Sequence, residues 1–149
     1  MKKVLCGVFL LLIIVSSMAG CSNTANTAKT KSAYEVTEVE NVRMSITNIT
    51  PTGARLTIED TNAPQNVYGQ WFALETRFGS DWYGLQARIE NFGFNDLGYL
   101  PNENGEITFD VDWEWLYGKL PQGTYRILKQ VNHQYISVLF EIETTSLSP

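Results

Sequence analysis

The chain has 149 residues, a formal net charge of −5, two Cys and one His. A hydrophobic fraction of 44% with 12% aromatic residues excludes a disordered chain, and the length suits one folded domain with a short tail. The acidic balance argues against nucleic acid as a partner. One His and two Cys leave little material for a zinc site or a Cys–His nucleophile, so we expect no metal and no cofactor.

The first 20 residues are typical of a secretion signal. Lys2 and Lys3 form a positive start, and residues 4–15 form an apolar run that is too short to span a bilayer. Ala19 and Gly20 directly before Cys21 resemble the lipobox of bacterial lipoproteins. That resemblance implies cleavage before Cys21 and lipidation of its thiol, which would anchor the domain to the membrane on the extracytoplasmic side. The alternative is an ordinary signal peptide in which this Cys stands by chance.

Residues 21–33 are expected to form a flexible tether, because they are small or polar and cannot bury enough surface to fold. Cleavage would discard Cys6 and leave Cys21 as a thioether, so no disulfide is expected in the mature chain. It would also remove two of the 11 basic residues, which leaves a net charge of −7 against the 16 acidic ones.

Residues 34–149 are expected to form one all-β domain, an antiparallel sandwich, because short alternating runs are separated by turn residues. Residues 42–47 and 55–59 alternate around a turn at 51–53, which predicts a hairpin with one buried face. Residues 60–66 predict a loop.

The next strand is expected to bury an apolar face: Tyr68, Phe72, Leu74 and Phe78. Its other face is expected to be polar and to face solvent, with Glu75 and Arg77. A turn at 79–81 follows, residues 92–101 give no clear assignment, and residues 106–111 predict a strand.

The last part of the chain predicts a hairpin. Residues 113–120 do not alternate, and a short helical turn and a strand remain open as alternatives. Residues 124–131 and 135–142 predict the two strands of the hairpin, with a turn around His133. The first of these strands is apolar on both faces in part, which predicts a central position in its sheet.

Leu120, Gly123 and Tyr125 form the pattern Leu-x-x-Gly-x-Tyr, which resembles the tyrosine corner of immunoglobulin-like sandwiches. Three motifs in order resemble a bacterial immunoglobulin-like domain: residues 68–75, Trp82, and residues 116–126. The resemblance covers roughly residues 42–142. It implies an immunoglobulin-like sandwich exposed at the cell surface, and it implies no reaction and no ligand.

Exposed aromatic rings stack on sugars or fill protein interfaces. Five residues are therefore candidates for a binding surface: Trp71, Trp82, Tyr83, Trp113 and Trp115. For any one Trp, burial in the sandwich core is the favoured interpretation. Trp71 alternates off the apolar face of its strand and is expected to be more exposed, and Trp113 with Trp115 are candidates to flank a patch.

Other candidate chemistries are weaker. Asp110, Asp112 and Glu114 alternate, but they fail as an EF-hand loop, and an acidic face turned to water is the favoured interpretation. His133 is expected in an exposed turn without a nucleophile. Glu103 with Glu106 gives no sign of a cleft with two carboxylates, so no catalytic residue is predicted.

The sequence therefore predicts a membrane-anchored bacterial lipoprotein with one immunoglobulin-like domain. We expect a non-catalytic interaction or accessory module that binds an envelope protein or polymer, with no nucleic acid as a partner. The alternatives are a carbohydrate-binding module that uses exposed aromatic residues and, less favoured, a small envelope hydrolase.

Overall fold

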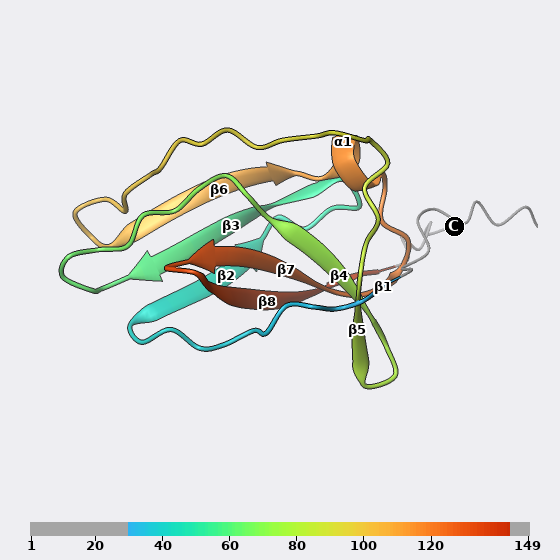
Figure 1. Ribbon diagram of the computed structural model, residues 1–149, viewed down its shortest axis with the longest axis horizontal. Helices are drawn as coiled ribbons and strands as arrows, with labels where there is room; N and C mark the ends of the chain where they lie inside the picture. Colours follow the sequence, from blue (N-terminus) through green and yellow to red (C-terminus); the bar gives the residue numbers. More distant parts are fainter. Residues whose placement is uncertain (1–29, 144–149) are drawn as a thin grey trace, which may run out of the picture.

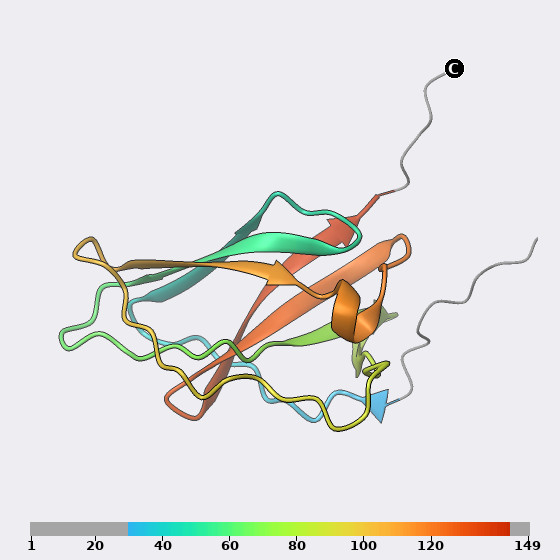
Figure 2. The same ribbon diagram turned by 90° about the horizontal axis from the view of Figure 1, so that it is seen from above.

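The computed structural model describes residues 30–143, which form two antiparallel β-sheets packed face to face (Figure 1). One sheet has five strands in the order β1-β5-β4-β7-β8, and the other has three in the order β2-β3-β6. The elements are β1 Thr30–Lys31, β2 Val42–Thr47, β3 Gly53–Asp60, β4 Ala73–Phe78, β5 Asp81–Gly84, β6 Glu106–Asp112, α1 Glu114–Tyr117, β7 Gly123–Val131 and β8 Gln134–Ile142. Seen from above, the two sheets form separate layers (Figure 2).

The β2–β3 hairpin follows the predicted alternation. Met44 faces Ile58 and Ile46 faces Leu56 across the two strands, and these side chains turn toward the other sheet. The turn before β3 is closed by Thr50, whose hydroxyl contacts both main-chain groups of Gly53. An added Cβ at Gly53 would lie 2.4 Å from the carbonyl oxygen of Val111, so only glycine allows β6 to approach this closely.

The core lies between the sheets and centres on Trp113, whose side chain is fully buried. Its ring stacks on Phe140 with 5.3 Å between centroids, and its indole nitrogen donates to the carbonyl of Pro51 at 2.9 Å. The indole thereby buries a large apolar surface with its one donor satisfied. Strand β7 lies between β4 and β8, so its predicted central position is confirmed.

The helical alternative for residues 113–120 is the correct one. The four-residue helix α1 begins at Glu114, whose N–H donates to the carboxylate of Asp112 at 2.8 Å. It ends at Tyr117, and Gly118 after it takes a positive φ of 78°. The helix buries Leu116 and Tyr117 at one end of the sandwich.

The β7–β8 hairpin turns through Asn132 and His133, which both have positive φ values, 46° and 65°. Two such residues between paired strands form the tight turn that suits the twist of a hairpin. His133 is exposed there.

Two of the four residues expected on the apolar face of β4 are placed differently by the structure. Tyr68 is fully buried as expected, but it precedes β4 and pairs with Tyr99 in an isolated bridge. Phe78 is 60% exposed rather than buried. Strand β4 pairs with β7 only as far as Thr76, so Phe78 lies on a β4–β5 hairpin that projects beyond the sandwich (Figure 1).

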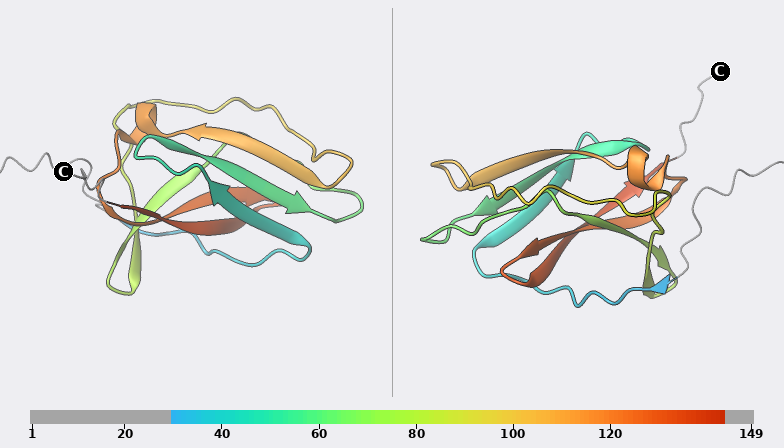
Figure 3. Two further views of the ribbon diagram at one scale, coloured as in Figure 1. Left: turned by 180° about the vertical axis from the view of Figure 1, so that it is seen from behind. Right: turned by 45° about the horizontal axis from the view of Figure 1, so that its top comes forward.

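Residues 30–36 form a segment that we call the N-terminal strap. It begins as β1 on the edge of β5 and ends where Val36 bridges Tyr135 of β8, so it crosses the outside of the five-stranded sheet (Figure 3). The expected tether is therefore wrong for its last residues, because the open edge of β5 offers hydrogen-bonding groups that the polar chain can take. The signal region 1–20 and Cys21 lie outside the described residues.

The strap also explains why Glu75 is buried instead of facing solvent as expected. The Glu75 side chain has no exposed surface, and it forms an ion pair with Arg126 of β7 at 2.6 Å. Alternation within β4 places this residue on the outer face of its sheet, as expected. The strap covers that face, which local alternation does not reveal.

The strand order is that of an immunoglobulin-like sandwich, in agreement with the sequence. Residues 85–105, which join β5 to β6, contain no strand. Strand β6 is therefore the edge of the three-stranded sheet, where sandwiches of this type commonly add a fourth strand. No helix in residues 30–143 is long and apolar enough to cross a membrane.

Candidate binding groove

The five aromatic candidates do not form one surface. The binding expectation is wrong for Trp113, because its ring lies in the core. Trp71 packs against Tyr34 of the strap and Tyr135 of β8, with centroids 5.9 and 5.7 Å away. Both rings cover Trp71 in part, so it is half-buried.

Trp82 and Tyr83 lie on β5. The guanidinium of Arg126 stands 4.5 Å above the centre of the Trp82 ring. Tyr83 packs edge-on against Phe78 at 5.8 Å. Tyr83 therefore packs within the β4–β5 hairpin, and Trp82 packs against Arg126 of β7.

Trp115 of α1 is the candidate that remains open to solvent, at 41% exposure. Its ring packs edge-on against Phe92 and Phe94, with centroid distances of 6.2 and 6.1 Å. Phe94 reaches inward to the buried Phe72 at 5.3 Å. The cluster joins a surface ring to the core, so Trp115 is held in place rather than free to rotate.

A groove of about 430 Å³ runs from Trp115 along the free edge of β6. The strand residues Ile107 to Asp112 form one side of the groove, and Phe94 and Tyr99 line the other. Tyr99 packs edge-on against Phe109 of β6 at 6.0 Å, so the two sides of the groove are in contact there. Sequence analysis missed Phe94 and Tyr99, and the only signal for them was the aromatic content of residues 92–101.

The wall opposite β6 is held by a small polar network. Gln70 donates to the hydroxyl of Tyr99 at 3.1 Å and accepts from the Asn95 amide at 2.8 Å. Tyr99 also exchanges both main-chain hydrogen bonds with Tyr68, at 2.9 Å each. These contacts fix the irregular chain between β5 and β6 without pairing it to β6.

The main chain of β6 alternates between its partner strand and the open groove. Asp60 N–H donates to the Gly105 carbonyl at 2.7 Å, and Trp113 N–H donates to the Thr52 carbonyl at 3.0 Å. Counted from these two bonds, the antiparallel register turns the N–H and C=O of Thr108 and Asp110 away from β3. Both residues are exposed, so the groove offers strand-pairing groups along its edge.

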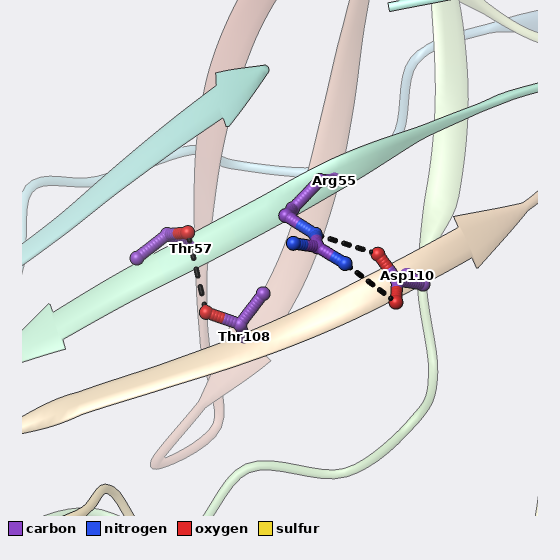
Figure 4. Close-up of polar contacts among 4 residues, drawn as sticks. All are labelled: Arg55, Thr57, Thr108 and Asp110. Carbon is purple, nitrogen blue, oxygen red and sulfur yellow. Dashed lines mark hydrogen bonds and ion pairs between the residues drawn. The ribbon is translucent and has the colours of Figure 1, made fainter. Parts of the chain in front are cut away.

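The outer face of β6 carries side chains that are tied to β3 (Figure 4). Arg55 binds both carboxylate oxygens of Asp110, at 2.8 and 3.0 Å, and the hydroxyls of Thr57 and Thr108 lie 3.4 Å apart. The guanidinium lowers the pKa of the Asp110 carboxyl, while slight desolvation opposes this. Asp110 therefore remains ionised beside the groove at neutral pH.

The acidic residues of β6 and α1 face water, as the favoured interpretation predicted. Asp110, Asp112 and Glu114 are exposed, and Val111 between them is buried. Among residues 30–143, no group of three His, Cys, Asp or Glu residues could hold a metal ion. Glu103 and Glu106 are both exposed at the start of β6.

Two further hollows of the surface are weaker candidates than the groove. A hollow of about 290 Å³ beside His133 and Trp71 is lined without any Ser, Cys or acidic residue. A larger one of about 1040 Å³ lies at the seam between β2 and β8, with Glu38, Glu40 and Glu59 on its walls. Arg43 lines this seam as well, and no aromatic ring lies among its walls, so the groove at β6 is the better candidate.

The motif at the start of β7 has the geometry that the resemblance implies. The hydroxyl of Tyr125 donates to the carbonyl of Pro121, four residues upstream, at 2.8 Å. Burial raises the pKa of Tyr125 to about 12, so the hydroxyl keeps its proton across the physiological range. Leu120 and Tyr125 are buried, and Gly123 lies against the tyrosine ring.

The fold and its groove define an immunoglobulin-like sandwich in which the free edge of β6 borders an aromatic groove. The family model of the bacterial Ig-like domain matches residues 38–146, which is most of the chain. The chain belongs to this family, whose domains are typically found at the cell surface or outside the cell. No curated protein and no solved structure matches it.

Proposed function

We propose that the protein is a lipid-anchored, non-catalytic recognition module that binds an extended segment of an envelope protein along β6. The observation that carries the proposal is the unpaired edge of β6 beside an aromatic groove. A peptide that adds to a sheet edge gains affinity from main-chain hydrogen bonds and specificity from the pockets under alternate side chains. The Ig-like family and the lipobox both favour a place outside the cytoplasm.

The groove indicates the chemistry of this segment. Side chains of an added strand alternate between the two faces of the sheet. Those facing inward would lie over Phe94, Tyr99 and Trp115, which favours apolar residues. Those facing outward would lie beside Asp110 and Asp112, which favours Lys or Arg. The proposed partner is therefore a strand with alternating basic and apolar residues.

A titration with a synthetic heptapeptide that alternates Lys and Val tests this proposal. We expect saturable binding to the full chain, measured by the change in tryptophan fluorescence, to which Trp115 beside the groove should contribute. Methylating the peptide amide nitrogens that would face β6 should abolish binding, because it removes main-chain donors and leaves the side chains unchanged. Equal binding of the methylated peptide would contradict strand addition.

A pair of variants in β6 sharpens the test. Thr108→Pro removes an N–H that faces the groove and spares the pairing with β3, because proline is tolerated on an edge. Thr108→Val keeps that N–H and loses only the hydroxyl. We expect Thr108→Pro to weaken peptide binding at least about tenfold and Thr108→Val to leave it nearly unchanged.

The carbohydrate-binding alternative has less support. A sugar platform needs several exposed rings, whereas Trp113 is buried and Trp71 is covered in part by Tyr34 and Tyr135. Titration with peptidoglycan fragments under the same conditions distinguishes the two functions. Saturable binding of a glycan without binding of the peptide would replace strand addition with this alternative.

The anchor is tested separately. Mass spectrometry of the mature N-terminus should find lipidated Cys21 as the first residue, and Cys21→Ala should prevent lipidation. An unmodified Cys21 in the processed chain would overturn the anchor and leave the groove proposal standing.

A further inference from the structure

A second pocket lies under the N-terminal strap, on the opposite sheet from the groove. It has a volume of about 560 Å³ and is bounded by the strap, by β4, and by the end of β5 with the three residues after it, 85–87. Tyr34, Leu85, Phe92 and Tyr117 are among the large apolar and aromatic side chains that line it. The volume lies within the range of small-molecule sites, which are mostly apolar with a few placed polar groups.

The placed polar group is Glu75. Its side chain is fully buried, and Arg126 directs both Nε and Nη2 to the same oxygen, Oε2, at 2.6 Å. The other oxygen, Oε1, is buried without a hydrogen-bond partner among the described residues. An unsatisfied buried carboxylate oxygen is costly, and native proteins rarely leave one without a partner.

Arg126 cannot easily serve both oxygens. The ring of Trp82 lies under its guanidinium at 4.5 Å, and the hydroxyl of Ser32 accepts from Nη2 at 3.5 Å. Both contacts hold the guanidinium beside Oε2. Glu75 lines the pocket, so a ligand that enters it can supply the donor that Oε1 lacks.

The charges select the kind of donor. Glu75 and Arg126 together are neutral, so a cationic ligand at Oε1 would lie close to the guanidinium and be repelled. An uncharged hydroxyl or N–H meets no such repulsion. The aromatic walls formed by Tyr34, Phe92 and Tyr117 favour a ring edge or face in the rest of the ligand.

We propose that the pocket under the strap binds a small uncharged molecule with an apolar ring and one hydroxyl or N–H, which donates to Oε1 of Glu75. The site is separate from the β6 groove and does not depend on the function proposed for it. The strap forms one wall, so an occupied pocket would hold residues 30–34 more firmly against the sheet.

Three probes of one shape test the proposal: p-cresol, toluene and benzylammonium. Titrated into the ¹⁵N-labelled full chain, p-cresol should give saturable shifts of the Gly84 and Glu75 amide signals. Toluene lacks the donor and should bind at least about tenfold more weakly, as should benzylammonium because of its charge. Equal binding of toluene, tighter binding of benzylammonium, or no saturable shift with p-cresol would overturn the proposal.

A variant that fills the pocket and a control variant outside it test where p-cresol binds. Ala87→Leu should abolish the p-cresol shifts, whereas Ser45→Leu, on the outer face of the other sheet, should leave them unchanged. If Ala87→Leu unfolds the chain, Gly84→Ala replaces it, since an added Cβ there would meet only the Thr30 carbonyl at an unstrained 3.9 Å. Unaltered p-cresol binding in the folded filled variant would place the probe elsewhere and contradict the assignment.

Discussion

The hydroxyl of Tyr68 donates a hydrogen bond of 3.0 Å to the carboxylate of Asp60, and both side chains are fully buried. The same carboxylate accepts the main-chain and side-chain N–H groups of Asn62 and Asn66, at 2.7 to 3.0 Å. A single charge at the end of β3 thereby organises the loop that the sequence predicted only as irregular. It also fixes Tyr68, whose main chain pairs with Tyr99 of the groove.

Asp60→Asn is expected to lower the free energy of unfolding by about 2–3 kcal/mol, because the amide directs two donors at groups that are themselves donors. Urea denaturation at pH 7 measures the change. Asp81→Asn is the control, because its exposed ion pair with Lys31 is screened by solvent and should contribute little to stability. Similar losses in both variants would contradict a special role for Asp60.

Acid should weaken the wild type through the same residue. Burial opposes ionisation of Asp60, but the hydrogen bonds from Asn66, Asn62 and Tyr68 outweigh it and lower its pKa. The stabilisation is therefore present above the ordinary Asp pKa of about 4 and is lost as the pH falls through the folded-state value. Denaturation between pH 2 and 6 should show a shallower acid loss in Asp60→Asn than in the wild type.

Lys129 predicts a rise in stability on the alkaline side. Its ammonium is buried between the sheets, where it donates to the Gly69 carbonyl and lies 4.2 Å from the centre of the Phe109 ring. Burial lowers the pKa of Lys129 to about 8, so between pH 8 and about 10 the unfolded chain binds more protons than the folded one. The free energy of unfolding should rise over this range by up to about 3 kcal/mol.

Lys129→Met should remove that rise, and Lys119→Met, at an exposed position, should keep it. Above about pH 10 stability should fall in all three proteins, because burial raises the pKa of Tyr117 and Tyr125 to about 12. Parallel profiles for the wild type and Lys129→Met between pH 8 and 10 would show that the ammonium is not desolvated.

The ion pair of Glu75 and Arg126 predicts strong coupling between two substitutions. Arg126→Leu leaves a buried carboxylate without its counter-charge and should cost about 3–5 kcal/mol. The double variant Glu75→Leu with Arg126→Leu removes both charges and should be more stable than Arg126→Leu alone. Chemical denaturation of the two single variants and the double variant measures the coupling. Additive losses would contradict it.

Trp113 and Trp115 should separate folding from binding. Trp113→Ala opens a cavity in the core and should cost about 3–5 kcal/mol, whereas Trp115→Ala should cost less than about 1 kcal/mol. Trp115→Ala should still weaken binding of the alternating Lys–Val peptide. Thermal unfolding and peptide titration of both variants provide the comparison. A large stability loss in Trp115→Ala would place that ring in the core instead.

Alternation along each strand predicted the sheets well, because a strand in a sandwich has one buried face. The same alternation would have predicted burial of Lys129, because this residue lies on the same face of β7 as Ile127 and Val131. A charged side chain is not normally expected on a buried face, so its burial was not predicted. Glu75 could not be predicted in the same way. Its burial depends on the strap, a distant and polar segment whose place is set by pairing with strand edges rather than by its own composition.

The groove was equally hidden. Phe94 and Tyr99 lie in chain without a repeating pattern, and their positions depend on the Gln70 network and the Tyr68 bridge. Trp113 and Trp115 differ in burial because α1 interrupts the alternation of β6 just between them. In the sequence this break shows only as two alternatives for residues 113–120, a short helical turn and a strand.

The strap also determines how the domain would respond to pulling. Any force that reaches the domain through the residues before Thr30 meets the two-residue pairing of β1 with β5 first, and then the rings around Tyr34. The sandwich core comes last in this order. Peeling residues 30–41 away would free a segment that reaches about 40 Å when fully extended, while β2 to β8 stay folded. A protein held at its N-terminus would thus lengthen under tension before its sandwich core unfolds.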